Sequence, residues 1–127
     1  MTDFVMVIGR DFERVITYKD NLGVAIDLTG YTAKLQARNI PSDSFKILDI
    51  TPTITPLTGT ITISISHTIL TEPALNLSKV SNTASLIDGD IKGTGKVVYY
   101  DLMLTAPSGK EFNLLDGRIC FVPSVTR

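Results

Sequence analysis

Apolar and polar residues alternate along most of the chain, which is the pattern of β-strands. The clearest segment is Tyr31–Arg38, where apolar and polar side chains take turns at successive positions. Ile61, Ile63 and Ile65 alternate with threonine and serine in the same way. Such a pattern gives a strand one buried face and one solvated face, which is typical of antiparallel sheets.

Several further segments carry strand patterns, and turn residues separate them. Asp20-Asn21-Leu22-Gly23 and Pro107-Ser108-Gly109 are the best examples, since asparagine, proline and glycine favour turn conformations. Val24–Leu28 is either a short strand or the end of one. The other predicted strands are Phe12–Tyr18, Phe45–Ile50, Thr60–Ser66, Val97–Thr105, Lys110–Leu115 and Arg118–Val122.

The pattern also predicts one hairpin and one short helical piece. Asp116-Gly117 is a strong two-residue hairpin signal, and it is expected to join the last two strands. Apolar residues near helical spacing in His67–Leu77 predict one or two helical turns, interrupted by Pro73.

The length of 127 residues suits one domain, 1–127, with a core of its own. About seven short strands with turn signals between them predict the all-β class. We expect an antiparallel β-sandwich, Ig-like or jelly-roll-like, with one short helical segment.

The segment Ser78–Gly95 is expected to interrupt this series of short strands and turns as a long inserted loop, about 78–95. It is rich in small, polar and glycine residues, and long loops are usually functional or disordered. Asp88-Gly89 leaves room for a small exposed hairpin. A mobile surface loop and a partner-binding arm are both consistent with this composition.

Charge and residue counts narrow the function classes. Twelve basic and thirteen acidic residues give a net charge of −1. The chain therefore lacks the excess of basic residues that is typical of a nucleic-acid binder.

No secretory or membrane-spanning segment is expected. The apolar stretch Phe4–Ile8 is too short for a secretory segment. Ile50–Thr71 has no charged residue but alternates, which argues against a membrane span.

The few reactive residues have structural explanations. His67 follows Ser66, but neighbours in a strand point to opposite faces, and no nucleophile elbow is present. Cys120 is the single cysteine, so an internal disulfide is excluded, and no histidine or second cysteine near it in the sequence would activate it. Asp88 and Asp90 lack the remaining ligands of a calcium loop and fit a turn better.

Other candidate groups also have ordinary alternatives. Gly89, Gly93 and Gly95 form no phosphate loop, because no Gly-Lys-Ser/Thr follows. Tyr99 and Tyr100 are expected on opposite faces and therefore form no joint sugar platform. The polar strand face of Lys34, Gln36 and Arg38 can meet phosphate or an acidic partner, or simply face water. We therefore expect no catalytic, cofactor-binding or metal-binding residue and no cofactor.

Short motifs along nearly the whole chain resemble a known family when taken in order. They are Gly9-Arg10-Asp11-Phe12, Asp20-Asn21-Leu22-Gly23, Ile26-Asp27-Leu28-Thr29-Gly30-Tyr31, Gly59-Thr60-Ile61-Thr62-Ile63, Tyr99-Tyr100-Asp101-Leu102, Pro107-Ser108-Gly109, Leu114-Leu115-Asp116-Gly117 and Pro123-Ser124-Val125-Thr126-Arg127. Their order is similar to that of small β-sandwich proteins and modules of tailed bacteriophages, found in tail, baseplate and neck structures. The chain departs from that pattern in Glu72–Gly95, where it carries extra residues.

The resemblance implies a non-enzymatic structural component of a phage virion, made in the host cytoplasm. The implied partners are other virion proteins and copies of the chain in a symmetric ring, with no nucleic acid, membrane or small-molecule substrate. Contacts are expected in Ser78–Gly95 and at the short termini. The alternative is a ligand-binding module that reads a host surface or a carbohydrate, which the absence of tryptophan disfavours. An enzyme is the least favoured class, because no acid–base constellation is visible.

Overall fold

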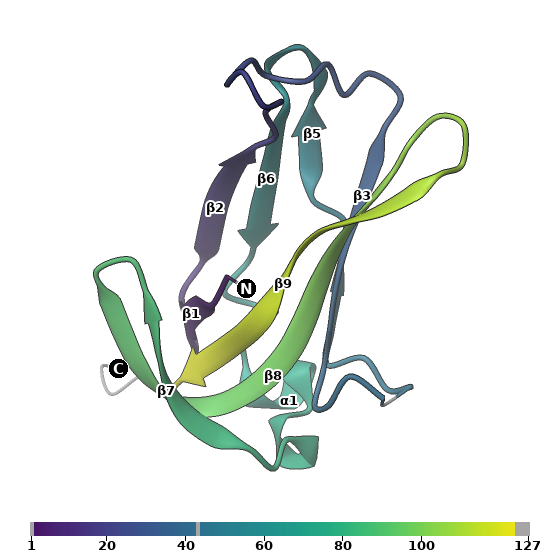
Figure 1. Ribbon diagram of the computed structural model, residues 1–127. Coiled ribbons are helices and arrows are strands. Elements are labelled where there is room, and N and C mark those ends of the chain that lie inside the picture. The colour runs from purple at the N-terminus through teal and green to yellow at the C-terminus, as the bar shows by residue number, and fades with distance from the viewer. Residues whose placement is uncertain (1, 43, 124–127) are drawn as a thin grey trace.

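The computed structural model describes residues 2–42 and 44–123, and the chain folds as an all-β sandwich of two facing sheets (Figure 1). The larger sheet has the order β1-β9-β8-β3-β4, with β7 paired to β8. Its strands are β1 (Phe4–Val7), β3 (Thr32–Arg38), β4 (Leu48–Ile50), β7 (Thr83–Asp88), β8 (Ile91–Thr105) and β9 (Glu111–Val122). The smaller sheet has the order β2-β6-β5, made of β2 (Phe12–Thr17), β6 (Thr60–Ile65) and β5 (Thr53–Thr55).

The main core fills the space between the two sheets. Alternate residues of each strand point inward, so that Leu35 and Leu102 of the larger sheet share one cluster with Ile61 and Ile63 of the smaller sheet. All the strand pairs are antiparallel except β1 with β9, which is parallel. The chain crosses between the sheets four times, from β1 to β2, from β2 to β3, from β4 to β5 and from β6 to β7.

The strand predictions at Phe12–Tyr18, Tyr31–Arg38 and Thr60–Ser66 are confirmed as β2, β3 and β6. Strand β4 occupies the end of the predicted Phe45–Ile50 strand, and β8 contains the predicted Val97–Thr105 strand.

The helical prediction within His67–Leu77 is confirmed as the short helix α1 (Glu72–Leu75). Pro73 lies in its first turn, where the missing N–H costs nothing, and does not interrupt it. The Thr71 hydroxyl caps the helix by accepting a hydrogen bond from the Ala74 N–H. Two single 3₁₀ turns, η1 (Pro56–Thr58) and η2 (Leu77–Lys79), complete the helical content of the described residues.

The predicted hairpin at Asp116-Gly117 is wrong, because Glu111–Val122 is the one continuous strand β9. Gly117 serves a close approach instead: a Cβ atom there would collide with the backbone of Thr2. The turn between β8 and β9 lies at the other predicted site, Pro107-Ser108-Gly109, where Gly109 has a φ of 90°.

Two further predictions need correction. Val24–Leu28 is not a strand: it contributes only an isolated bridge between Lys19 and Ala25, and its last residue bonds to η1. The inserted loop predicted at about 78–95 is instead η2, strand β7 and the first part of β8. Its glycines and small polar residues suit a hairpin that packs closely on the sheet. Strands β1 and β5 were not predicted, since each is too short to show a period.

Candidate functional site

The segment Thr83–Lys96, called the arm below, is a hairpin at one end of the larger sheet. Strand β7 pairs with Ile91–Lys96 of β8 from Thr83↔Lys96 to Asp88↔Ile91, and Gly89 turns the chain with a φ of 61°. The arm extends beyond the part of β8 that pairs with β3, and β8 bends so that the hairpin lies beside β1 (Figure 1). The arm therefore lies at the β1 edge of the sandwich.

Leu86 fixes the arm to the outer face of the larger sheet. It is buried in a second cluster with Val5, Val97 and Cys120, separate from the main core. Ala84 and Val122 pack around this cluster. The cluster is small, so the apolar surface that holds the arm in place is limited.

Two glycines allow the arm to approach the sheet closely. A Cβ atom on Gly95 would collide with the carbonyl oxygen of Phe121, and one on Gly93 would collide with the side chains of Val5 and Val122. A side chain at either position would lift the arm from the sheet. The glycine content that resembles a flexible loop is thus a packing requirement.

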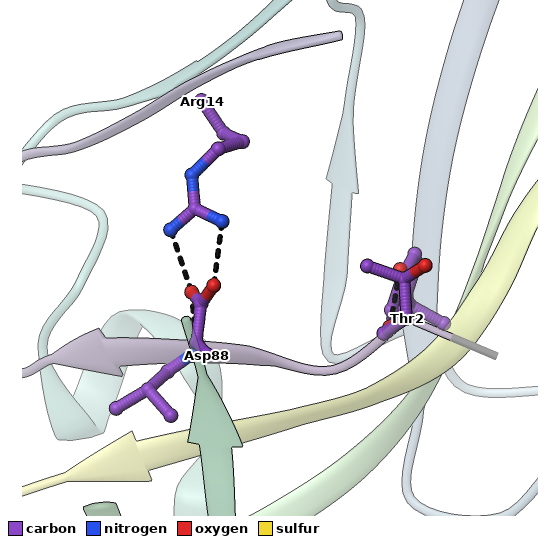
Figure 2. Close-up of polar contacts among 5 residues, drawn as sticks. Thr2, Arg14 and Asp88 are labelled. Atoms are coloured by element: carbon purple, nitrogen blue, oxygen red, sulfur yellow. Dashed lines mark hydrogen bonds and ion pairs between the residues drawn. The ribbon is translucent and has the colours of Figure 1, made fainter. Parts of the chain in front are cut away.

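Asp88 links the tip of the arm to both sheets (Figure 2). Its two carboxylate oxygens each accept a hydrogen bond of 2.6 Å from the Arg14 guanidinium of β2. Oδ2 also accepts from the backbone N–H of Val5 in β1, at 3.2 Å. Asp88 is only 7% exposed, so it occurs in the fold as a partnered buried charge rather than as a turn residue in water.

Aromatic rings hold Arg14 from the other side. Its Cζ lies 5.3 Å from the ring centroids of both Phe4 and Phe12, close enough for cation–π attraction. The two rings meet edge to face at 5.7 Å, and Phe4 stacks on Tyr100 at 5.1 Å. The hydrogen bonds that Arg14 donates to Asp88 raise the pKa of Arg14. The ion pair is thus built into the aromatic end of the main core.

Two apolar side chains at the tip of the arm are exposed, one on each face of the hairpin, because Ile91 pairs with Asp88 and Ile87 pairs with Lys92. Ile87 is 61% exposed and Ile91 is 49% exposed, and they flank the turn. A hollow of about 330 Å³ lies along the hairpin and is lined by Ser85, Leu86, Ile87, Lys92, Gly93 and Thr94. The arm therefore presents exposed apolar side chains on a strand pair whose tip is held by the ion pair of Asp88 with Arg14, which suits a contact with another protein.

His67 is engaged in a local polar contact. Its Nδ1 lies 2.9 Å from Asp11 Oδ1, and its backbone N–H donates to the same oxygen at 2.6 Å. These contacts lower the pKa of Asp11, first through the backbone hydrogen bond. The neighbouring Ser66 hydroxyl pairs with Thr68 at 3.0 Å instead of with His67. The structure therefore does not assemble the Ser–His pair that the sequence juxtaposes.

Cys120 is completely buried beneath the arm. Its Sγ lies 3.8 Å from the carbonyl oxygen of Ala84, and burial raises its pKa. A thiol with a raised pKa and no access is a poor nucleophile. Cys120 belongs to the small cluster under the arm.

The two neighbouring tyrosines lie on opposite faces of β8, as the alternation predicts. Tyr100 points into the core and donates its hydroxyl to the Thr2 carbonyl at 2.6 Å. Tyr99 lines a hollow of about 230 Å³ together with Gln36, Arg38 and Asp101. Lys34 pairs with Asp49 at 3.2 Å, so one cation of the polar strand face is engaged within the sheet.

No cluster of three or more metal-ligating side chains occurs among residues 2–42 and 44–123. None of the helices in this part of the chain has the length and apolar character needed to cross a membrane.

Arg14 was not among the residues predicted from the sequence to form a site. The sequence did contain an indication of its role. The alternation of β2 places Arg14 on the same side as Phe12 and Ile16, facing the core. An arginine on a core face requires a partner, but the partner lies 74 positions away along the chain. The contact between Arg14 and Asp88 depends on the bend of β8. The local sequence pattern does not indicate this bend.

No protein-family model matches the chain, and a search of the curated proteins finds no significant match.

Proposed function

We propose that this protein is a non-enzymatic structural component of a tailed-phage virion, in the tail, baseplate or neck, and that the arm is its main contact with neighbouring subunits. The order of short motifs along the chain supports the virion assignment, and the exposed tip of the arm supports the mode of action. That tip, with Ile87 and Ile91 exposed on a hairpin fixed by Asp88, is the observation that carries the assembly role.

Successive side chains of β7 point alternately toward the molecule and toward solvent. Leu86 and Asp88 face the molecule and fix the hairpin in position, whereas Ile87 faces solvent. While the arm is closed, its side chains are already positioned, so binding in this state loses little conformational entropy and favours assembly. Repeated copies around a symmetric ring would each present the same tip.

Quantitative mass spectrometry of purified intact particles from the source tests the virion assignment. We expect the chain at stoichiometric copy number, such as a multiple of about three or six for a symmetric ring. Absence from the particles would contradict the assignment. Screening on a glycan array would then test the alternative, a ligand-binding module.

The contact role of the arm is tested separately, with Ile87→Ser and Ile91→Ser. Both side chains are exposed, so the variants should fold normally and enter particles poorly. Leu57→Ser is the matched control, since Leu57 is 81% exposed on η1, outside the arm. Normal incorporation of the two arm variants would contradict the proposed role.

A further inference from the structure

We propose that the arm also protects the free edge of β1, and that displacing it turns this edge into a pairing surface for a second copy of the chain. The inference concerns the isolated protein and stands independently of the virion assignment. It rests on three features: the composition of β1, the position of Asp88 and the small apolar contact that holds the arm on the sheet.

Strand β1 is an edge strand without protection of its own. Its sequence, Phe4-Val5-Met6-Val7, contains no charge and no proline. Proteins usually guard such edges with lysine, proline, bulges or inward-pointing charges, because an open apolar edge pairs with other chains. Another part of the molecule must therefore prevent the β1 edge from pairing with other chains.

The directions of the backbone N–H groups in β1 show which of them must be covered at the free edge. The N–H groups of Thr2 and Ile8 donate to carbonyl oxygens of Asp116 and Val122, toward β9. By alternation along the strand, the N–H groups of Val5 and Val7 point to the free edge. Here the Asp88 carboxylate accepts from Val5, so it occupies the position that a pairing strand would use.

The arm is held mainly by this polar contact and only weakly by apolar burial. Leu86 is its one large side chain in the small cluster, and Ile87 and Ile91 remain exposed. Loss of the carboxylate leaves Arg14 without its anion and Val5 without its acceptor. The arm should then open locally, since regions with few buried apolar contacts open first.

A second copy is the occupant that fits the uncovered surface. Opening exposes an uncharged strand edge next to the apolar strip of Val5, Val97 and Cys120. Two such edges can pair about a two-fold axis, in which each copy gives the other the same surface. Pairing would also cover both strips, so the interface combines backbone hydrogen bonds with apolar burial.

The test compares Asp88→Ala with Asp90→Ala, which removes an equal charge from the exposed side of the same turn. Molar mass is measured by light scattering over rising protein concentration, and Cys120 labelling by a maleimide reports arm opening. We expect Asp88→Ala to form dimers and to label about 10- to 100-fold faster, as loss of charge-assisted hydrogen bonds predicts. Asp90→Ala should match the wild-type protein in both measurements.

A second substitution locates the contact. Val7→Lys adds a charge to the β1 edge, so the double variant Asp88→Ala/Val7→Lys should open the arm and stay monomeric. If Asp88→Ala does not fold, Asp88→Asn replaces it, because the amide keeps the shape and loses the charge. The proposal is overturned by unchanged Cys120 labelling, by an open arm without dimers, or by dimers that persist with Val7→Lys.

Discussion

The molecule contains two apolar clusters that are held together in different ways. The main core joins both sheets through alternating side chains such as Leu35, Ile63 and Leu102, and the ion pair borders it only at its aromatic end. The cluster under the arm has four buried residues and depends on the neighbouring contact between Asp88 and Arg14. The comparison teaches that burial gives this fold its stability, whereas a charge determines where the arm lies.

The largest effect is expected in the main core. Ile63→Ala removes a fully buried side chain from the middle of β6, and it should cost about 2–5 kcal/mol of unfolding free energy. Urea unfolding measures the loss. Val15→Ala is the control, because Val15 is 54% exposed, and it should change stability by less than about 0.5 kcal/mol. Equal losses in the two variants would contradict the assignment of the core.

Leu86→Ala should behave differently although Leu86 is also buried. A buried leucine normally costs about 2–5 kcal/mol, but here the loss is limited to the free energy that holds the arm closed. We therefore expect a smaller loss in urea unfolding than for Ile63→Ala, together with faster labelling of Cys120. A loss as large as that of Ile63→Ala would show that the arm and the main core unfold as one unit.

Tyr100 tests the aromatic end of the core at high pH. Burial raises its pKa above the usual value of about 10. Its contribution to stability is therefore complete below pH about 10 and is lost as the pH rises through the folded-state pKa. Tyr100→Phe should cost about 1 kcal/mol near neutral pH, through the lost hydrogen bond to Thr2.

The pH dependence provides a check on that variant. Urea unfolding between pH 8 and pH 11, chosen to bracket the ordinary tyrosine pKa of about 10, should show a weaker alkaline loss for Tyr100→Phe than for the wild-type protein. Identical alkaline profiles would contradict the burial argument for Tyr100.

An effect as small as that of Tyr100→Phe is expected at the cap of α1. Thr71→Ala removes the hydroxyl that accepts from the Ala74 N–H, at a cost of about 1 kcal/mol. Thr71→Ser keeps the oxygen and should restore most of the stability in thermal unfolding. Cys120 labelling should stay at the wild-type rate in both variants, since α1 lies outside the arm.

The fold class could be predicted from sequence because period two is a local signal. Thr60–Ile65 shows it in full, with three isoleucines on one face. The signal fails where a local motif has another use: Asp116-Gly117 has hairpin chemistry, but Gly117 is needed for the approach of the Thr2 backbone. It also fails for β1, whose four residues are buried or nearly so, without alternation.

The arm and its ion pair were beyond local reasoning for a different reason. Gly93 and Gly95 weaken a strand pattern, and only their contacts with Val5, Phe121 and Val122 explain them. Asp88 beside Gly89 is typical of a turn, and nothing nearby in the sequence indicates its contact with Arg14. The composition of Ser78–Gly95 indicated an unusual segment, and the small hairpin allowed at Asp88-Gly89 is confirmed, but the packing of that hairpin on the sheet was not predicted.

The central claim is that the arm is held separately from the main core, and Cys120 in the unmodified protein tests it most directly. The labelling rate of Cys120 is measured at increasing urea concentrations below the unfolding transition. We predict labelling through local opening of the arm, at a rate that depends only weakly on urea because little surface becomes exposed. Labelling with the full urea dependence of global unfolding would contradict the account, since the arm would then open only when the whole sandwich unfolds.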